Sequence, residues 1–158
     1  MIENLLLLKL IHVLSSTVLF GTGLGVAYFM FMACRSCDPI VVAHTAGIVV
    51  VADAVFVANA AIVQPVSGVQ LALTIGYSLS ESWIVASLAL YAVVAACWLP
   101  VLWLQVQMRN MARVAVEEGT GLPKRYDRLF RIWFMLGWPA LISMLAIFAL
   151  MIFKPALW

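Results

Sequence analysis

Charged residues are scarce in this chain: Lys, Arg, Asp and Glu together make up 10% of its 158 residues, while 66% are hydrophobic. Soluble globular domains carry about a quarter charged and about half apolar residues, so the composition excludes that class. Four stretches are almost free of charge, at residues 5–33, 40–63, 83–105 and 132–153. Each is longer than the roughly 18 residues that cross a bilayer, and in lipid such segments must be helical. We therefore expect one all-α transmembrane domain, residues 1–158, built as a four-helix bundle.

Basic residues are missing from one side of this expected bundle. Seven of the nine Lys and Arg residues fall in the connections before the second and fourth stretches, and residues 64–82 contain none. Because basic loops stay in the cytoplasm, we expect both termini on the extracytoplasmic side. The start has no basic segment and no cleavage site follows it, so we expect a retained span there and no signal peptide. The net charge of +2 follows from the basic loops, and no basic face interleaved with aromatics indicates a nucleic-acid partner.

The connection between the second and third stretches lacks the apolar length of a span. Gln64 precedes Pro65, and the residue before a proline is pushed out of the helical region, so we expect the second helix to end there. Residues 66–80 are only half apolar and include Gly68 and Gly76. This pattern predicts a short re-entrant or interfacial segment over the outer end of the bundle.

Histidine is also scarce, and one of the two, His12, lies inside the first span. Ionisable side chains within spans are costly and are functional candidates by default. At about 100° per residue, Ser16 and Gly23 share the helix face of His12. Two interpretations are open: an interhelical hydrogen bond, for example to Asn59, or axial ligation of a haem iron. His44 lies too far along the bundle to ligate the same haem.

Counting helix positions from the membrane edges brings Asn59, Tyr91 and Met144 close to the depth of His12. Each of them could support or ligate whatever His12 holds. Asp53 lies near the middle of the second span, where an unpaired carboxylate would take up a proton. We expect Asp53 to be neutral with a hydrogen-bond partner, to be paired, or to act as a proton relay.

Only three cysteines are present, which excludes a zinc site of four cysteines within one protomer. Cys34 and Cys37 form a CxxC pattern, but the βαβ context of thioredoxin-like chemistry is absent. They are either reduced loop thiols or, with His44, part of a soft-metal site for Cu(I). Met30 and Met32 lie at the same end of the bundle and would suit such a site.

Small residues recur every four positions in the first span, at Thr17, Gly21 and Gly25. Such a stripe lets another helix approach closely. The neighbour is either a helix of the same protomer or a second copy of the chain, and the glycines could also leave room for a flat cofactor. We expect a homodimer or larger homo-oligomer.

Several motifs together resemble a bacterial family of small integral membrane proteins of unassigned function. They include residues 10–16 (LIHVLSS), 20–25 (FGTGLG), 64–68 (QPVSG), 97–100 (CWLP), 122–126 (LPKRY) and 133–137 (WFMLG), so the resemblance covers essentially the whole chain. That family is distantly similar to the HemJ and CopD-like group of four-helix membrane proteins. The HemJ members bind haem b through a first-helix histidine and oxidise protoporphyrinogen; the CopD members are linked to copper.

The resemblance implies a protein of the bacterial inner membrane in which His12 is the haem b ligand. The arginine and histidine that follow the first helix in HemJ proteins are not matched by Cys34-Arg-Ser-Cys37, so it implies haem binding without protoporphyrinogen oxidation. Two hypotheses follow. The first is a b-type haem protein that transfers electrons, or an oxidoreductase, with a redox partner in the membrane. The second is a non-catalytic component for copper handling or for assembly of a larger complex.

Overall fold

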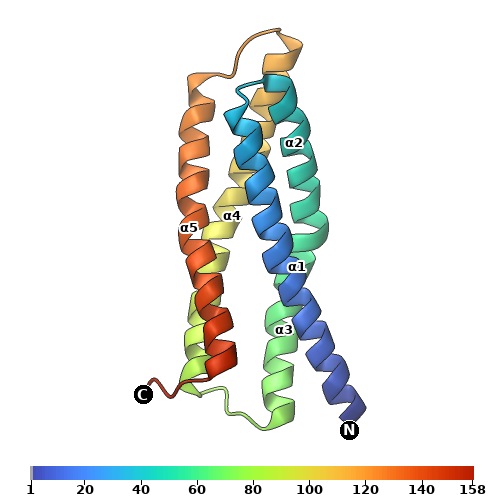
Figure 1. Cartoon of the computed structure of the whole chain (residues 1–158), viewed down its shortest axis with the longest axis vertical. Helices are drawn as coiled ribbons and strands as arrows, with labels where there is room; N and C mark the ends of the chain where they lie inside the picture. Colours follow the sequence, from blue (N-terminus) through green and yellow to red (C-terminus); the bar gives the residue numbers. More distant parts are fainter. Residues whose placement is uncertain (1) are drawn as a thin grey trace.

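The computed structural model describes residues 2–158, and every regular element in that range is helical. The elements are α1 (Ile2–Arg35), α2 (Pro39–Ala52), the π-helical turn η1 (Asp53–Val57), α3 (Ala58–Ile75), α4 (Ser82–Glu117) and α5 (Lys124–Phe153). Because α2, η1 and α3 follow one another without a break, the helices form four columns (Figure 1). All four are long and apolar enough to cross a membrane. The expected all-α membrane bundle is confirmed.

The two ends of the bundle differ in character (Figure 1). Residues 36–38 and 118–123 connect helices at one end, which we call the basic end because Arg35, Lys124 and Arg125 flank these connections. Residues 76–81 and the C-terminus lie at the other, which we call the terminal end. At the basic end, Pro39 occupies the first turn of α2, and the Asp38 carboxylate caps that turn by accepting the Ile40 N–H at 2.8 Å.

The expected helix end at Gln64-Pro65 and the re-entrant or interfacial segment at residues 66–80 are wrong. Pro65 lies inside α3, which continues to Ile75 and ends at Gly76 in the left-handed conformation with φ 96°. A proline inside a helix leaves the carbonyl four residues earlier without its N–H donor. Here the Tyr91 hydroxyl of α4 donates to that carbonyl, the Ala61 oxygen, at 2.5 Å. A side chain from a neighbouring helix thus satisfies the group that the proline leaves unpaired, and the helix continues.

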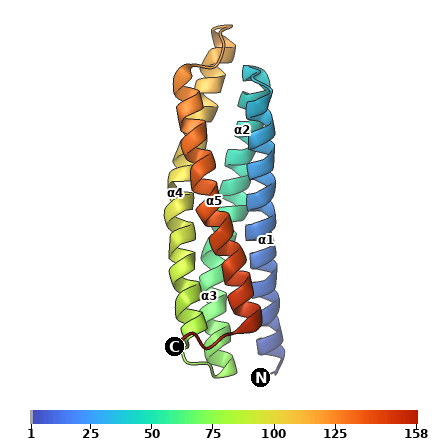
Figure 2. The ribbon, with the colours of Figure 1, turned by 60° about the vertical axis from the view of Figure 1, so that its left-hand side comes forward.

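The helices pack as two groups that meet mainly at the basic end. α4 and α5 contact each other extensively, α1 packs on α3, and α2 packs on α4, whereas α1 and α5 touch at few points. Figure 2 shows the α4–α5 pair beside the other helices. The largest buried cluster, which includes Met30, Val42, Met108 and Tyr126, lies toward the basic end. Toward the terminal end the two groups are held together by smaller clusters.

The outer surface of the columns is apolar. Leu6, Ile48, Ile62, Met135 and Ile152 are all more than half exposed. In water such a surface would be costly, whereas in a bilayer these side chains contact acyl chains. Gly21 and Gly25 are also unpacked, since a Cβ at either would meet no atom within 4 Å. The small-residue stripe is therefore not used inside the protomer, and self-association stays a prediction.

The C-terminal residues close the terminal end. The Lys154 ammonium donates to the Tyr77 hydroxyl at 3.0 Å and lies 4.7 Å from the Tyr77 ring centroid and 5.5 Å from that of Trp83. The Ser82 hydroxyl accepts the Leu157 N–H at 2.9 Å. A cation over two aromatic rings is favourable. These contacts tie the end of α5 to the start of α4.

Candidate functional site

His12 takes part in a polar network between α1 and α3. Its Nδ1 lies 3.1 Å from the Ser67 hydroxyl, and its Nε2 lies 3.2 Å from the Gln64 amide nitrogen. The Ser15 hydroxyl donates to the Gln64 side-chain oxygen. The imidazole packs closely against Gly68, where a Cβ would approach its Cε1 to 2.9 Å. Two of the sequence motifs, residues 10–16 and 64–68, therefore pack directly on each other.

The network fixes one tautomer of the imidazole. The Ser67 hydroxyl donates its own hydrogen to the Val63 carbonyl at 2.7 Å, so it accepts from Nδ1–H. Nε2 then carries the lone pair and accepts from the Gln64 amide. Haem iron binds an imidazole through such a lone pair. In this arrangement the nitrogen that would bind iron already has a partner, so the surroundings of His12 do not fit a haem.

The other residues expected near His12 lie elsewhere. Ser16 hydrogen-bonds to the Val13 carbonyl of its own helix at 2.8 Å, and it is Ser15 that reaches α3. Asn59 is exposed and donates to the Val55 carbonyl at 2.6 Å, so it is not a partner of His12. Tyr91 and Met144 belong to a cluster with Leu19 one to two turns further from the terminal end.

A large cavity, about 610 Å³, lies between the two helix groups. Gly23, Asp53, Tyr91 and Met144 line it, so four of the residues selected from the sequence share one site. Its volume is within the range of small-molecule pockets, about 300–1,000 Å³. None of the described residues that line it is a histidine, a lysine or an arginine. A haem held by His12 would therefore not occupy this cavity.

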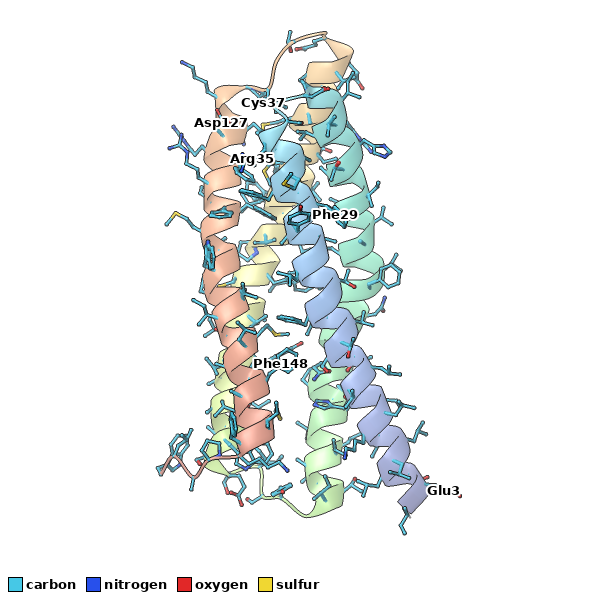
Figure 3. All side chains as sticks on the ribbon, in the orientation of Figure 1. Glu3, Phe29, Arg35, Cys37, Asp127 and Phe148 are labelled. Carbon is cyan, nitrogen blue, oxygen red and sulfur yellow. The ribbon has the colours of Figure 1, made fainter. Side chains whose placement is uncertain are left out.

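The cavity reaches the outer surface of the bundle. Leu24 and Tyr28 of α1 and Trp138 of α5 line it and are about half exposed. The opening lies between α1 and α5, which touch at few points. Toward the terminal end these two helices meet where the ring of Phe148, labelled in Figure 3, packs edge to face on Phe20 with centroids 5.3 Å apart. The cavity is thus open to the surrounding lipid and bounded at this aromatic contact.

Four buried polar atoms in the described residues have no hydrogen-bond partner, and all four belong to residues of the cavity wall. They are Asp53 Oδ2, Trp98 Nε1, Gln105 Oε1 and Trp133 Nε1. Buried polar groups are nearly always paired, and each unpaired group costs about 1–3 kcal/mol. Each of the four atoms has almost no accessible surface, so they are buried in the packing around the cavity and do not face its interior.

Asp53 is the first residue of the π-helical turn η1 and is 2% exposed. The side chains of Gln105 and Trp98 lie beside its carboxyl group, yet its Oδ2 has no hydrogen-bond partner. Single π-turns inside α-helices occur frequently at functional sites. The predicted hydrogen bonding of Asp53 is incomplete within the protomer, because one of its carboxyl oxygens has no partner. A role of Asp53 as a proton relay stays a prediction.

The residues expected to bind copper are not brought together. Cys34 turns inward, with its sulfur 2.8 Å from the Tyr126 hydroxyl, while Cys37 and His44 are exposed. Figure 3 shows Cys37 at the basic end, close to Arg35. Met30 is completely buried and Met32 is nearly half exposed. Across residues 2–158 no three His, Cys, Asp or Glu side chains are placed to hold a metal ion. This donor set does not fit a copper site in the arrangement seen.

Trp98, Gln105 and Trp133 were not selected from the sequence. A usable signal was present, because Trp98 and Gln105 are seven residues apart and so share one face of α4. A glutamine on the same face as a tryptophan, inside an apolar helix, indicates a polar spot within the bundle. Gln105 was instead interpreted as the boundary of the third span.

The fold and the cavity define a class: a polytopic helical membrane protein with an internal, largely apolar cavity that carries a few polar groups. Within this class the chain belongs to the family described as "Predicted integral membrane protein (DUF2269)", which matches residues 6–155. The expected membership of a membrane family of unassigned function is thereby confirmed. No curated protein and no solved structure matches the chain.

Proposed function

We propose that this protein binds a lipophilic molecule in the cavity beside Asp53. The observation that carries the proposal is a cavity of about 610 Å³ with an almost wholly apolar wall, open to the outer surface between α1 and α5. An apolar molecule gains from contact with this wall, whereas a strongly polar one would lose its hydration without finding hydrogen-bond partners there. The protein is then a membrane-embedded binding protein, either as a component of a larger complex or as the site of a reaction on the bound molecule.

The proposal is tested with two glycines of α1. Gly23 lines the cavity and a Cβ there would meet no atom within 4 Å, so Gly23→Leu fills the cavity without disturbing the backbone. Gly21 is exposed and outside the cavity, which makes Gly21→Leu the matched control. We expect native mass spectrometry of the mildly solubilised protein to find a bound lipophilic molecule that Gly23→Leu loses and Gly21→Leu keeps.

Equal retention by both variants would contradict a site in the cavity. The same measurement reports on self-association, because the outward stripe that contains Gly21 is expected to form the contact between copies. Gly21→Leu should therefore shift the protein toward the monomer while leaving the bound molecule in place.

Haem b with His12 as ligand, in an electron-transfer protein or oxidoreductase, is the alternative that the sequence resemblance supplies. Two observations contradict this alternative. Both imidazole nitrogens of His12 are hydrogen-bonded, and no histidine is among the described residues that line the cavity. We expect protein purified from haem-replete cells to show no Soret band that depends on His12. A Soret band lost in His12→Ala and retained in His44→Ala would overturn this assignment and restore the haem interpretation.

The orientation in the bacterial inner membrane is also a proposal. It rests on the basic residues, seven of nine of which lie in the connections before the second and fourth stretches. A cysteine at Glu81, at the terminal end, should react with an impermeant thiol reagent in intact cells, and one at Glu118 should not; Cys34, Cys37 and Cys97 are replaced by serine in both variants. Reaction at Glu118 alone would reverse the orientation.

A further inference from the structure

Two of the four unpaired buried atoms are oxygens of neighbouring side chains. Asp53 Oδ2 comes from η1 and Gln105 Oε1 from α4, and the Gln105 side chain lies beside the Asp53 carboxyl group. A carboxylate oxygen and an amide oxygen only accept hydrogen bonds, so an ionised Asp53 leaves both atoms without a donor. Because neither oxygen has appreciable accessible surface, a molecule in the cavity cannot supply that donor. The donor has to come from the two side chains themselves.

No cation is placed to stabilise an ionised Asp53. Among the described residues of the cavity wall, Asp53 is the only acidic one and none is basic. Arg109 lies one turn beyond Gln105 on α4, but its guanidinium donates to Asn110 Oδ1 at 3.0 Å. The other titratable groups of the wall are a thiol and two phenols, which are uncharged at neutral pH and belong to Cys97, Tyr28 and Tyr91.

The helices that pack against η1 also bring no charge to this point. α3 contains no titratable side chain, and the only one of α2, His44, is exposed and lies nine residues before Asp53. On α1, His12 is hydrogen-bonded to α3. The acidic and basic residues of α1 lie toward its two ends, at Glu3, Lys9 and Arg35. Burial of an unpaired carboxylate is costly, whereas a neutral acid needs only hydrogen bonds, so these surroundings favour the neutral form of Asp53.

We infer that Asp53 binds a proton inside the membrane and, as a neutral carboxylic acid, donates its O–H to Gln105 Oε1. The Gln105 amide N–H donates in return to the second carboxyl oxygen. One proton then satisfies two buried oxygens that are otherwise both unpaired. The pair joins η1 to α4 beside the cavity, and loss of the proton would leave a negative charge against an acceptor oxygen. This proton site is independent of what occupies the cavity, so it goes beyond the proposed function.

Infrared spectroscopy of the purified full-length protein tests this site, because a neutral carboxyl group has a carbonyl band that a carboxylate lacks. The other six of the seven Asp and Glu side chains are exposed, so at neutral pH only Asp53 is expected to give this band. We expect the band in the wild type in an ester-free detergent, and its loss in Asp53→Asn. Asp127→Asn removes an exposed carboxylate and is the matched control, which should keep the band.

Gln105→Met tests the partner of the proton. It keeps a side chain of similar length and removes the amide, so the band should persist but move to higher frequency as the carboxyl group loses its hydrogen bonds. A wild type without the band would overturn proton binding at Asp53. A band at the same frequency in Gln105→Met would overturn the pairing with Gln105.

Thermal unfolding in the same detergent gives a second readout. The amide group of Asp53→Asn presents an N–H donor in place of the carboxyl O–H, so this variant should unfold close to the wild-type temperature. Asp53→Leu leaves Gln105 Oε1 without a donor and should unfold at a lower temperature. Equal losses in the two variants would contradict the role of Asp53 as a hydrogen-bond donor.

Discussion

Gly68→Val is expected to lower the stability of the protein by about 1–3 kcal/mol, the usual cost of overpacking a closely packed contact. A Cβ at this position would lie 2.9 Å from His12 Cε1. The ring cannot move away freely, because Ser67 and Gln64 hold both of its nitrogens. Relief of the clash therefore costs hydrogen bonds between α1 and α3, and thermal unfolding in detergent should occur at a lower temperature.

Gly137→Val is the control for this prediction. Gly137 is also a helical glycine, and a Cβ there would meet no atom within 4 Å. Any general effect of a β-branched residue in a membrane helix is shared by the two variants, so the difference between them isolates the contact with His12. An equal change in both would mean that α1 and α3 do not pack closely at this point.

Tyr91→Phe is expected to cost about 1–2 kcal/mol, because it leaves the Ala61 carbonyl unpaired in an apolar environment. The reason lies in Pro65, which has no N–H to offer that carbonyl. In a Pro65→Ala background the new backbone N–H can take the place of the tyrosine hydroxyl. There the cost of Tyr91→Phe should largely disappear.

A double-mutant cycle measures this coupling. Unfolding free energies of the wild type, Tyr91→Phe, Pro65→Ala and the double variant are compared in the same detergent. Equal costs of Tyr91→Phe in both backgrounds would contradict the account of how α3 continues through its proline.

The columns were predictable from the sequence because lipid imposes a simple rule: long apolar stretches must form helices. The end of the second helix was not, because it depends on one contact from another helix. The rule that a residue before proline leaves the helix is local, whereas the Tyr91 hydroxyl that overrides it comes from 26 residues beyond Pro65 in the chain. Local patterns carry no information on such a partner.

The candidate site was found in part. Asp53 was selected as a carboxylate within a span, Gly23 because it shares a helix face with His12, and Tyr91 and Met144 by their depth. All four line the cavity. His12 was given the central role for the same reason as Asp53, yet its hydrogen bonds are satisfied within the protomer. The sequence identifies polar groups inside the membrane, and only the packing distinguishes a group that already has its partners from one that lacks them.

Because the cavity opens to lipid between α1 and α5, its occupancy depends on the concentration of the ligand within the membrane. A molecule that enters past Leu24, Tyr28 and Trp138 comes from the hydrocarbon phase, where lipophilic compounds accumulate. Occupancy therefore follows the mole fraction of the ligand in the bilayer and not its amount in the surrounding water. Added lipid at constant ligand dilutes the ligand and empties the site, so an affinity for this protein has meaning only when the ratio of ligand to lipid is stated.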